Sequence, residues 1–177
     1  MATTGSQPWT FASQSGIAQD DNVTSDFDVA GSSSGQYGFF QLVGGGAGSI
    51  SQIINFASPG SFTLSYLEAG RTLALASHAG DLQYSVTITP TVGPAVLSVS
   101  DTTSTSQSFT PTSYNFNVPS AGNYTLTFTA VAHATSNVDD TAYIDNVQIV
   151  PEPSTSVLGA MGLLGLLVRR IRSNQRA

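Results

Sequence analysis

Carboxylates are the side chains of this sequence best suited to chemistry, and Asp145 is the most informative of them. Strict alternation along its expected strand places it on the side of three core-type residues, Tyr143, Val147 and Ile149. A buried carboxylate without a partner is costly, so Asp145 needs one. The chain has no lysine and a single arginine before its tail, which leaves Arg71, a backbone or hydroxyl donor, or a metal ion. The alternatives are capping by backbone amides, or a bulge that turns the carboxylate outward.

The other acidic residues give weaker signals. Most of them cluster on expected loops: Asp20, Asp21, Asp26, Asp28, Asp139 and Asp140. Hard oxygen ligands on loops suit calcium, but no spacing here matches an EF-hand or another regular calcium motif, which favours solvated loop acids. Glu68 is the only glutamate before the tail, and nothing singles out an aspartate to pair with it for glycoside cleavage.

No catalytic residue emerges from the sequence, and we expect the protein not to be an enzyme. The absence of cysteine excludes thiol chemistry, disulfides and cysteine-ligated zinc. Two histidines, His78 and His133, are too few for a histidine-rich metal site. Neither a G-x-S-x-G nucleophile turn nor a phosphate-binding P-loop occurs.

Carbohydrate binding needs exposed aromatic rings beside hydrogen-bonding groups. The available groups are one arginine and five rings: Arg71, Trp9, Tyr37, Tyr84, Tyr114 and Tyr143. Tyr66, Tyr84 and Tyr124 fall on the apolar sides of their strands, so core packing is their expected role. Pairing of Arg71 with Glu68 or another nearby acid is at least as well supported as ligand binding. No residue stands out as a ligand site.

The charge of the chain before its tail limits its partners. Residues 1–150 carry ten acidic residues against one arginine, hence a net charge of −9. Such a body does not attract nucleic acid or an anionic membrane surface, whereas calcium and neutral polymers suit it. About 150 residues are enough for one domain with a core.

These residues form a series of short β-prone segments separated by turns. Phe62, Leu64 and Tyr66 alternate with hydroxyl residues, the pattern of a strand with one buried and one wet face. The expected strands are Trp9–Ala12, Tyr37–Val43, Ser49–Phe56, Ser61–Leu67, Leu82–Thr89, Pro94–Ser100, Tyr114–Val118, Tyr124–Ala130 and Ala142–Val150. Residues 13–34 are polar and predict a loop with at most a brief strand. The pattern predicts an all-β fold, an antiparallel two-sheet β-sandwich or jelly roll.

One segment is echoed later in the chain. Residues 54–66 and residues 116–128 both turn through proline and glycine into an alternating strand. Two similar hairpin-like units predict related edges of a two-sheet sandwich and not a tandem repeat.

The last 27 residues differ from the body. Pro151, Glu152 and Pro153 precede an apolar span at residues 154–168 and a basic end at residues 169–176. The prolines hold the chain extended and stop a helix from running backward. Residues 153–171 as a helix reach about 28 Å, a marginal length for a hydrocarbon core of about 30 Å. We therefore expect one short C-terminal hydrophobic helix.

The basic end sets the expected orientation. Its arginines are Arg169, Arg170, Arg172 and Arg176. Positive charge after a span marks the cytoplasmic side, so Arg169, Arg170 and Arg172 are expected to stop transfer, with the body on the other side of the membrane.

The Pro-Glu-Pro motif, the short Gly/Leu-rich span and the Arg-rich end together resemble a PEP-CTERM sorting signal. The resemblance implies export, and recognition of Pro151, Glu152 and Pro153 by the membrane protease exosortase, usually in an exopolysaccharide or biofilm context. Residues 154–171 would hold the protein in the membrane before processing. Export needs a signal peptide, and MATTGSQPWTF has neither a basic nor an apolar region, so we expect the true start to lie upstream.

Over roughly Trp9–Val150 the body resembles galactose-binding-like jelly-roll domains and carbohydrate-binding modules. The segments that carry this likeness are GSISQIINF, GSFTLSYLEAGR, GNYTLTF and TAYIDNVQI. Members usually open with an Asn/Gly-Gly-Phe-Glu strand, which we expect upstream. In these modules, the aspartate matching Asp145 helps to hold a structural calcium together with ligands from that opening strand.

The sequence thus predicts a β-sandwich domain at residues 1–150 and a sorting signal at residues 151–177. The expected function is that of an exported, non-enzymatic cell-surface or extracellular-matrix protein, sorted by exosortase, with weak binding to carbohydrate or exopolysaccharide. The alternative is a structural matrix or biofilm protein that binds no sugar, and a hydrolase is a third, less supported interpretation. The only cofactor expected is the structural calcium at Asp145.

Overall fold

The computed structural model describes residues 8–19, 35–71, 80–133 and 139–152, and these residues form strands and turns without a helix. The strands are β1 (Thr10–Phe11), β2 (Ser15–Gln19), β3 (Gln36–Val43), β4 (Gly46–Ala47), β5 (Ser49–Phe56), β6 (Gly60–Gly70), β7 (Leu82–Pro90), β8 (Leu97–Thr103), β9 (Thr110–Val118), β10 (Gly122–His133) and β11 (Asp139–Pro151). Each strand expected from the sequence is present. The brief strand allowed within residues 13–34 is β2, and β4 had no counterpart in the prediction.

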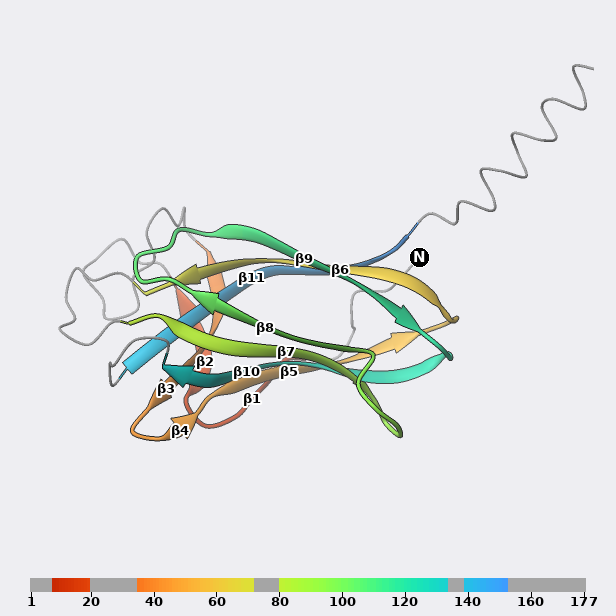
Figure 1. Ribbon diagram of the computed structural model, residues 1–177, viewed down its shortest axis with the longest axis horizontal. Helices are drawn as coiled ribbons and strands as arrows, with labels where there is room; N and C mark the ends of the chain where they lie inside the picture. Colours follow the sequence, from red (N-terminus) through yellow and green to blue (C-terminus); the bar gives the residue numbers. More distant parts are fainter. Residues whose placement is uncertain (1–7, 20–34, 72–79, 134–138, 153–177) are drawn as a thin grey trace, which may run out of the picture.

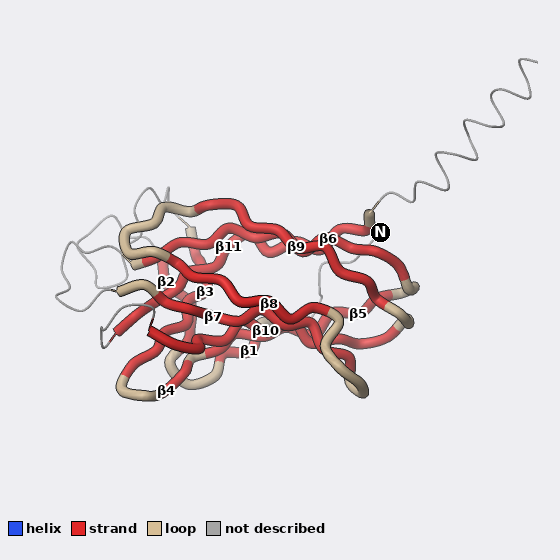
Figure 2. Tube along the Cα trace, in the orientation of Figure 1, coloured by secondary structure: helices blue, strands red, loops and turns tan. Residues whose placement is uncertain are grey.

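Two antiparallel sheets form the layers of a sandwich (Figures 1 and 2). One has the order β1-β5-β10-β7-β8, and the other has the order β2-β3-β11-β6-β9, with β4 paired to β3. All pairings are antiparallel, which confirms the predicted β-sandwich.

The alternating side chains of the long strands build the core between the layers. Leu64 on β6, Val86 on β7 and Leu126 on β10 are completely buried, and each has a hydroxyl residue as its neighbour along the strand. Full burial of one such side chain contributes about 1.5–3 kcal/mol, so this inner face stabilises the sandwich strongly. Aromatic rings complete it: Phe56 meets Phe62 and Tyr124 edge-on, with ring centroids 4.7 and 5.2 Å apart.

The two echoed units are sheet-crossing corners, so the expectation of hairpin-like units is wrong. β5 and β6 lie in different sheets, and so do β9 and β10. The units pair with each other instead: β5 with β10 in one sheet, and β6 with β9 in the other. Both corners lie at the same end of the sandwich, where β11 also ends (Figure 1).

Several predicted features lie outside the described residues. They are the apolar span at residues 154–168, the basic end with Arg169, Arg170 and Arg172, Pro153, His78, and the loop acids Asp20, Asp21, Asp26 and Asp28. Within the described ranges, no helix has the length and apolarity needed to cross a membrane.

Candidate functional site

A bulge in β11 overturns the alternation predicted around Asp145. The pairing of β11 with β6 shifts register between Asp145 and Gln148, and Asn146 has a left-handed φ of 50°. Before the bulge, Tyr143 lies in a small cluster apart from the main core; after it, Ile149 belongs to the main core. Asp145 therefore shares a face with Tyr143 but not with Ile149, because the one extra residue of the bulge reverses the side on which later side chains fall.

The surroundings of Asp145 match the capped and bulged alternative. The side chain is half-buried, and its Oδ1 accepts the backbone N–H of Asn146 at 2.6 Å. In the described ranges, no three His, Cys, Asp or Glu side chains come together as a metal site. Calcium at Asp145 remains a prediction from the resemblance.

The described residues enclose an edge pocket of about 570 Å³ where β1 and β2 end their sheets. Both sheets contribute to it, and the lining is Pro8, Trp9, Phe11, Ile17, Gln36, Tyr37, Gly38, Ile50, Gln52, Ile144, Asp145, Asn146 and Val147. β1 has only two residues and cannot cover the interior along the whole length of β5. Ile17 of β2 is consequently 58 % exposed, although it pairs with the inward-facing Gly38.

Apolar and polar groups occupy different parts of this edge pocket. Ile50 and Ile144 belong to the main core, and the half-buried Trp9 packs against it, with its ring centroid 6.4 Å from that of Phe128. The polar residues among its lining are Gln36, Gln52, Asp145 and Asn146. The Asn146 Oδ1 accepts from Gln148 at 2.7 Å, while its side-chain nitrogen has no partner among the described residues.

A carboxyl group also lies inside the sandwich, at Glu68 on β6. The residue is 6 % exposed, and Thr112 donates its hydroxyl to the Glu68 Oε1 at 2.9 Å. Tyr84 donates its hydroxyl to the other carboxyl oxygen, and the Tyr66 hydroxyl lies 3.1 Å from that of Tyr84. Burial raises the pKa of Glu68 above its ordinary 4.5, although both donated hydrogen bonds favour the carboxylate.

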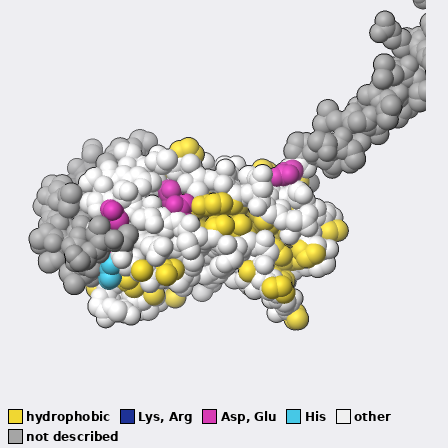
Figure 3. Space-filling view, in the orientation of Figure 1, with side chains coloured by type: hydrophobic (Ala, Val, Ile, Leu, Met, Phe, Trp, Pro, Cys, Tyr) yellow, Lys and Arg dark blue, Asp and Glu magenta, His cyan; other side chains and the backbone are white. Residues whose placement is uncertain are grey.

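Asp101 on β8 is the acidic neighbour of Glu68 that the sequence did not single out. Its charge further raises the pKa of Glu68, and its Oδ2 accepts from the Tyr114 hydroxyl at 2.6 Å. On the face shown in Figure 3, acidic side chains adjoin one end of an apolar strip. Because both Glu68 oxygens are occupied by hydroxyl donors, the pair has structural partners and does not form the open carboxylate pair that glycoside cleavage requires.

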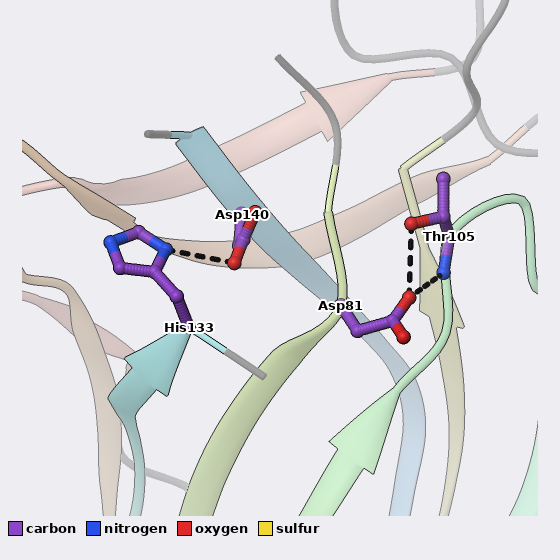
Figure 4. Close-up of polar contacts among 4 residues, drawn as sticks. All are labelled: Asp81, Thr105, His133 and Asp140. Atoms are coloured by element: carbon purple, nitrogen blue, oxygen red, sulfur yellow. Dashed lines mark hydrogen bonds and ion pairs between the residues drawn. The ribbon is translucent and has the colours of Figure 1, made fainter. Parts of the chain in front are cut away.

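Figure 4 shows two further polar contacts. The His133 Nδ1 is 2.8 Å from Oδ2 of Asp140, whose side chain is completely buried. Asp81 accepts the backbone N–H of Thr105 at 2.7 Å and its hydroxyl at 3.0 Å. Asp140, expected on a solvated loop, is thus an inner residue of β11, and its partner His133 ends β10.

Most of the aromatic rings considered for ligand binding are core residues. Tyr37, Tyr84 and Tyr143 are 3 % exposed or less, whereas Trp9 and Tyr114 are half-buried. Sequence alternation would have located Glu68, since it follows Phe62, Leu64 and Tyr66 at the same spacing. The edge pocket had no sequence signal, because residues far apart in the chain line it.

The Pro-Glu-Pro motif begins on the folded body. Pro151 is the last residue of β11 and pairs with Phe62 of β6. Glu152 follows, half-buried, and donates its backbone N–H to the Ser61 carbonyl at 2.9 Å.

One family match covers the end of the chain. The PEP-CTERM protein-sorting motif matches residues 150–173, a stretch that includes Pro151 and Arg172. The match confirms the predicted sorting motif, which implies an exported protein that exosortase processes. No curated protein matches the chain.

Solved structures with the same fold include carbohydrate-binding modules. A family 61 module in complex with β-1,4-galactotriose superposes with a TM-score of 0.56 at 14 % identity, covering 82 % of this chain and 89 % of that chain. A family 4 module has a TM-score of 0.54 at 12 % identity, with 81 % and 94 % covered. A cyclase from Fischerella sp. TAU, in complex with an indolyl butanone, has a TM-score of 0.55 at 12 % identity, with 82 % and 85 % covered.

At these identities the likeness concerns the fold, and that fold serves both binding modules and an enzyme. The chain thus combines a jelly-roll β-sandwich, of the kind found in carbohydrate-binding modules, with a C-terminal PEP-CTERM protein-sorting motif.

Proposed function

We propose that this exported protein reaches the cell surface or extracellular matrix and binds a neutral polysaccharide there through its edge pocket. One observation carries the proposal: the half-buried Trp9 lies in a pocket of about 570 Å³ together with Gln52 and Asp145. The fold shared with carbohydrate-binding modules supports it.

The chemistry of the edge pocket suits a sugar ring. An aromatic ring offers an apolar face to the C–H side of the sugar, while amides and a carboxylate hydrogen-bond its hydroxyls. Ligand pockets of about 300–1,000 Å³ are typical, and a few polar groups on an apolar wall fix the orientation of the ligand. Trp9, Asp145 and Asn146 line the same pocket and are residues of these kinds.

The single tryptophan of the chain makes the site directly testable. Full-length protein is titrated with neutral oligosaccharides while the Trp9 fluorescence is recorded, and binding is measured independently by calorimetry. We expect a saturable change in emission. Trp9→Ala should weaken calorimetric binding about tenfold or more, since buried tryptophans dominate binding energies.

Two further variants separate binding from folding. Asp145→Asn keeps the shape and the cap of Asn146 while removing the charge, and should weaken binding about tenfold. Val92→Ala, at an 89 % exposed position on the β7–β8 turn, should leave binding unchanged. If an oligosaccharide binds without changing the Trp9 emission, and Trp9→Ala does not weaken this binding, the binding site lies outside the edge pocket.

The alternative is a structural matrix protein that binds no sugar. A complete lack of binding across neutral glycans by the folded full-length protein would favour it. A hydrolase is less supported, because Glu68 and Asp101 already accept hydrogen bonds from the Tyr84 and Tyr114 hydroxyls.

A further inference from the structure

The first two residues of the sorting motif belong to the β-ladder of the sandwich. β11 pairs with β6 through Val150↔Thr63 and Pro151↔Phe62, and the Glu152 N–H continues the ladder to the Ser61 carbonyl at 2.9 Å. No spacer separates the body from the motif.

The Glu152 side chain is also held by β6. The Thr63 hydroxyl donates to the Glu152 Oε1 at 3.4 Å and to the Asn115 Oδ1 of β9 at 2.9 Å. One hydroxyl hydrogen serves two acceptors, so the contact with the glutamate is the weaker one. Glu152, the central residue of Pro-Glu-Pro, is therefore half-buried against the body.

This strand end can open without disturbing the core. β11 pairs with β3 only up to Ile144, so beyond the bulge β6 is the one strand of the described chain that holds it. Pro151 fits there because its neighbour Glu152 directs an N–H to β6, which turns the Pro151 nitrogen to the open edge. Ile149 is 7 % exposed and belongs to the core, whereas Val150 is 49 % exposed. Opening is thus confined to the residues after Ile149.

We propose that the sandwich restrains its own sorting motif: exosortase engages Pro151 and Glu152 only after residues 150–152 have separated from β6. Thr63 and the Ser61 carbonyl are the groups that hold the motif back. The proposal rests on processing by exosortase, which the sorting motif implies. A substrate whose competent form is a minor population shows a raised KM and an unchanged kcat.

Two changes shift this opening in opposite directions. A Gly-Ser spacer between Val150 and Pro151 detaches the motif from the ladder. It should lower KM for processing roughly 2- to 10-fold, the effect of one or two hydrogen bonds, with kcat unchanged. The same spacer placed after Val92, on an exposed turn far along the chain, is the matched control and should have no effect.

A disulfide between β11 and β6 should hold residues 150–152 in the paired state. The chain has no cysteine, and directly paired residues of an antiparallel ladder have Cα atoms about 5.5 Å apart, within disulfide range. In the variant Thr63→Cys with Val150→Cys, oxidation should slow processing about tenfold or more, and reduction should restore it.

The assay uses the full chain and exosortase in the same vesicles, with another PEP-CTERM protein as a positive control. Equal processing of the oxidised and reduced double variant would overturn the restraint and leave exosortase processing intact. If no form of the chain is processed while the positive control is, exosortase processing of this protein is itself wrong, and the restraint with it.

Discussion

At the scale of single residues, Glu68 shows how burial and hydrogen bonding compete. Removal from water disfavours its carboxylate, and the nearby charge of Asp101 adds to this effect. The hydroxyls of Tyr84 and Thr112 favour the carboxylate but do not compensate, so the pKa rises. Folding therefore shifts the equilibrium of Glu68 toward the neutral acid, compared with the unfolded chain.

This preference predicts a pH dependence of stability. Because the folded-state pKa lies above the ordinary 4.5, the folded protein binds a proton more tightly than the unfolded chain does. The contribution of Glu68 to the free energy of unfolding is therefore complete below pH 4.5. It is lost as the pH rises through the folded-state pKa.

Urea unfolding of the wild-type protein and Glu68→Gln across this range measures the effect. Glutamine imitates the neutral acid, so the difference in free energy, wild type minus variant, should fall with rising pH. A difference that rises would mean that the hydrogen bonds outweigh burial. Thr125→Val on the outer face of β10 serves as the control and should track the wild type.

At the scale of elements, the bulge in β11 determines which residues of this last strand lie in the core and which lie at the edge pocket. It returns Val147 and Ile149 to the core and leaves Asp145 and Asn146 at the edge pocket. The left-handed φ of 50° at Asn146 makes the bulge possible, since asparagine tolerates that conformation better than most residues.

Substitution of Asn146 tests this dependence. Asn146→Val should lower the free energy of unfolding by about 1–2 kcal/mol, because a β-branched side chain clashes in the left-handed region. Asn146→Gly should be nearly neutral. Asn117→Val, at an exposed strand position of β9 without positive φ, should change stability by about 0.5 kcal/mol or less. An Asn146→Val variant with the same free energy of unfolding as the wild type would argue against the bulge.

At the scale of the whole molecule, charge selects the class of partner. A body with ten acidic residues and one arginine repels anionic polymers, whereas a neutral polymer experiences no such repulsion. The edge pocket adds Asp145 to this field.

We therefore expect affinity electrophoresis to retard the protein in neutral polysaccharide gels and not in gels of an anionic polysaccharide. Retardation in the neutral gel should vary less than about twofold between low and high salt, since no ion pair forms across the interface. Retardation by the anionic polymer that salt abolishes would contradict the proposed neutral ligand.

The candidate sites differ in how far the sequence predicts them. Alternation predicts the buried faces of β6 and β7 correctly. Continued along β6, the same alternation predicts that Glu68 is buried. The same rule fails in β11, where the one extra residue of the bulge reverses the faces after Asp145. Trp9 could be recognised as an aromatic candidate, but nothing local indicates that Gln52 and Asn146 lie in the same pocket.

By itself the sequence determined every strand except β4, and the sorting motif, because alternation, turn residues and a Pro-Glu-Pro before an apolar span are local patterns. Only the tertiary structure decided which strands pair, where an edge pocket opens and that Glu152 lies against Ser61 and Thr63. Those features depend on contacts between residues tens of positions apart. Their formation reflects the packing of two whole sheets, which no local pattern encodes.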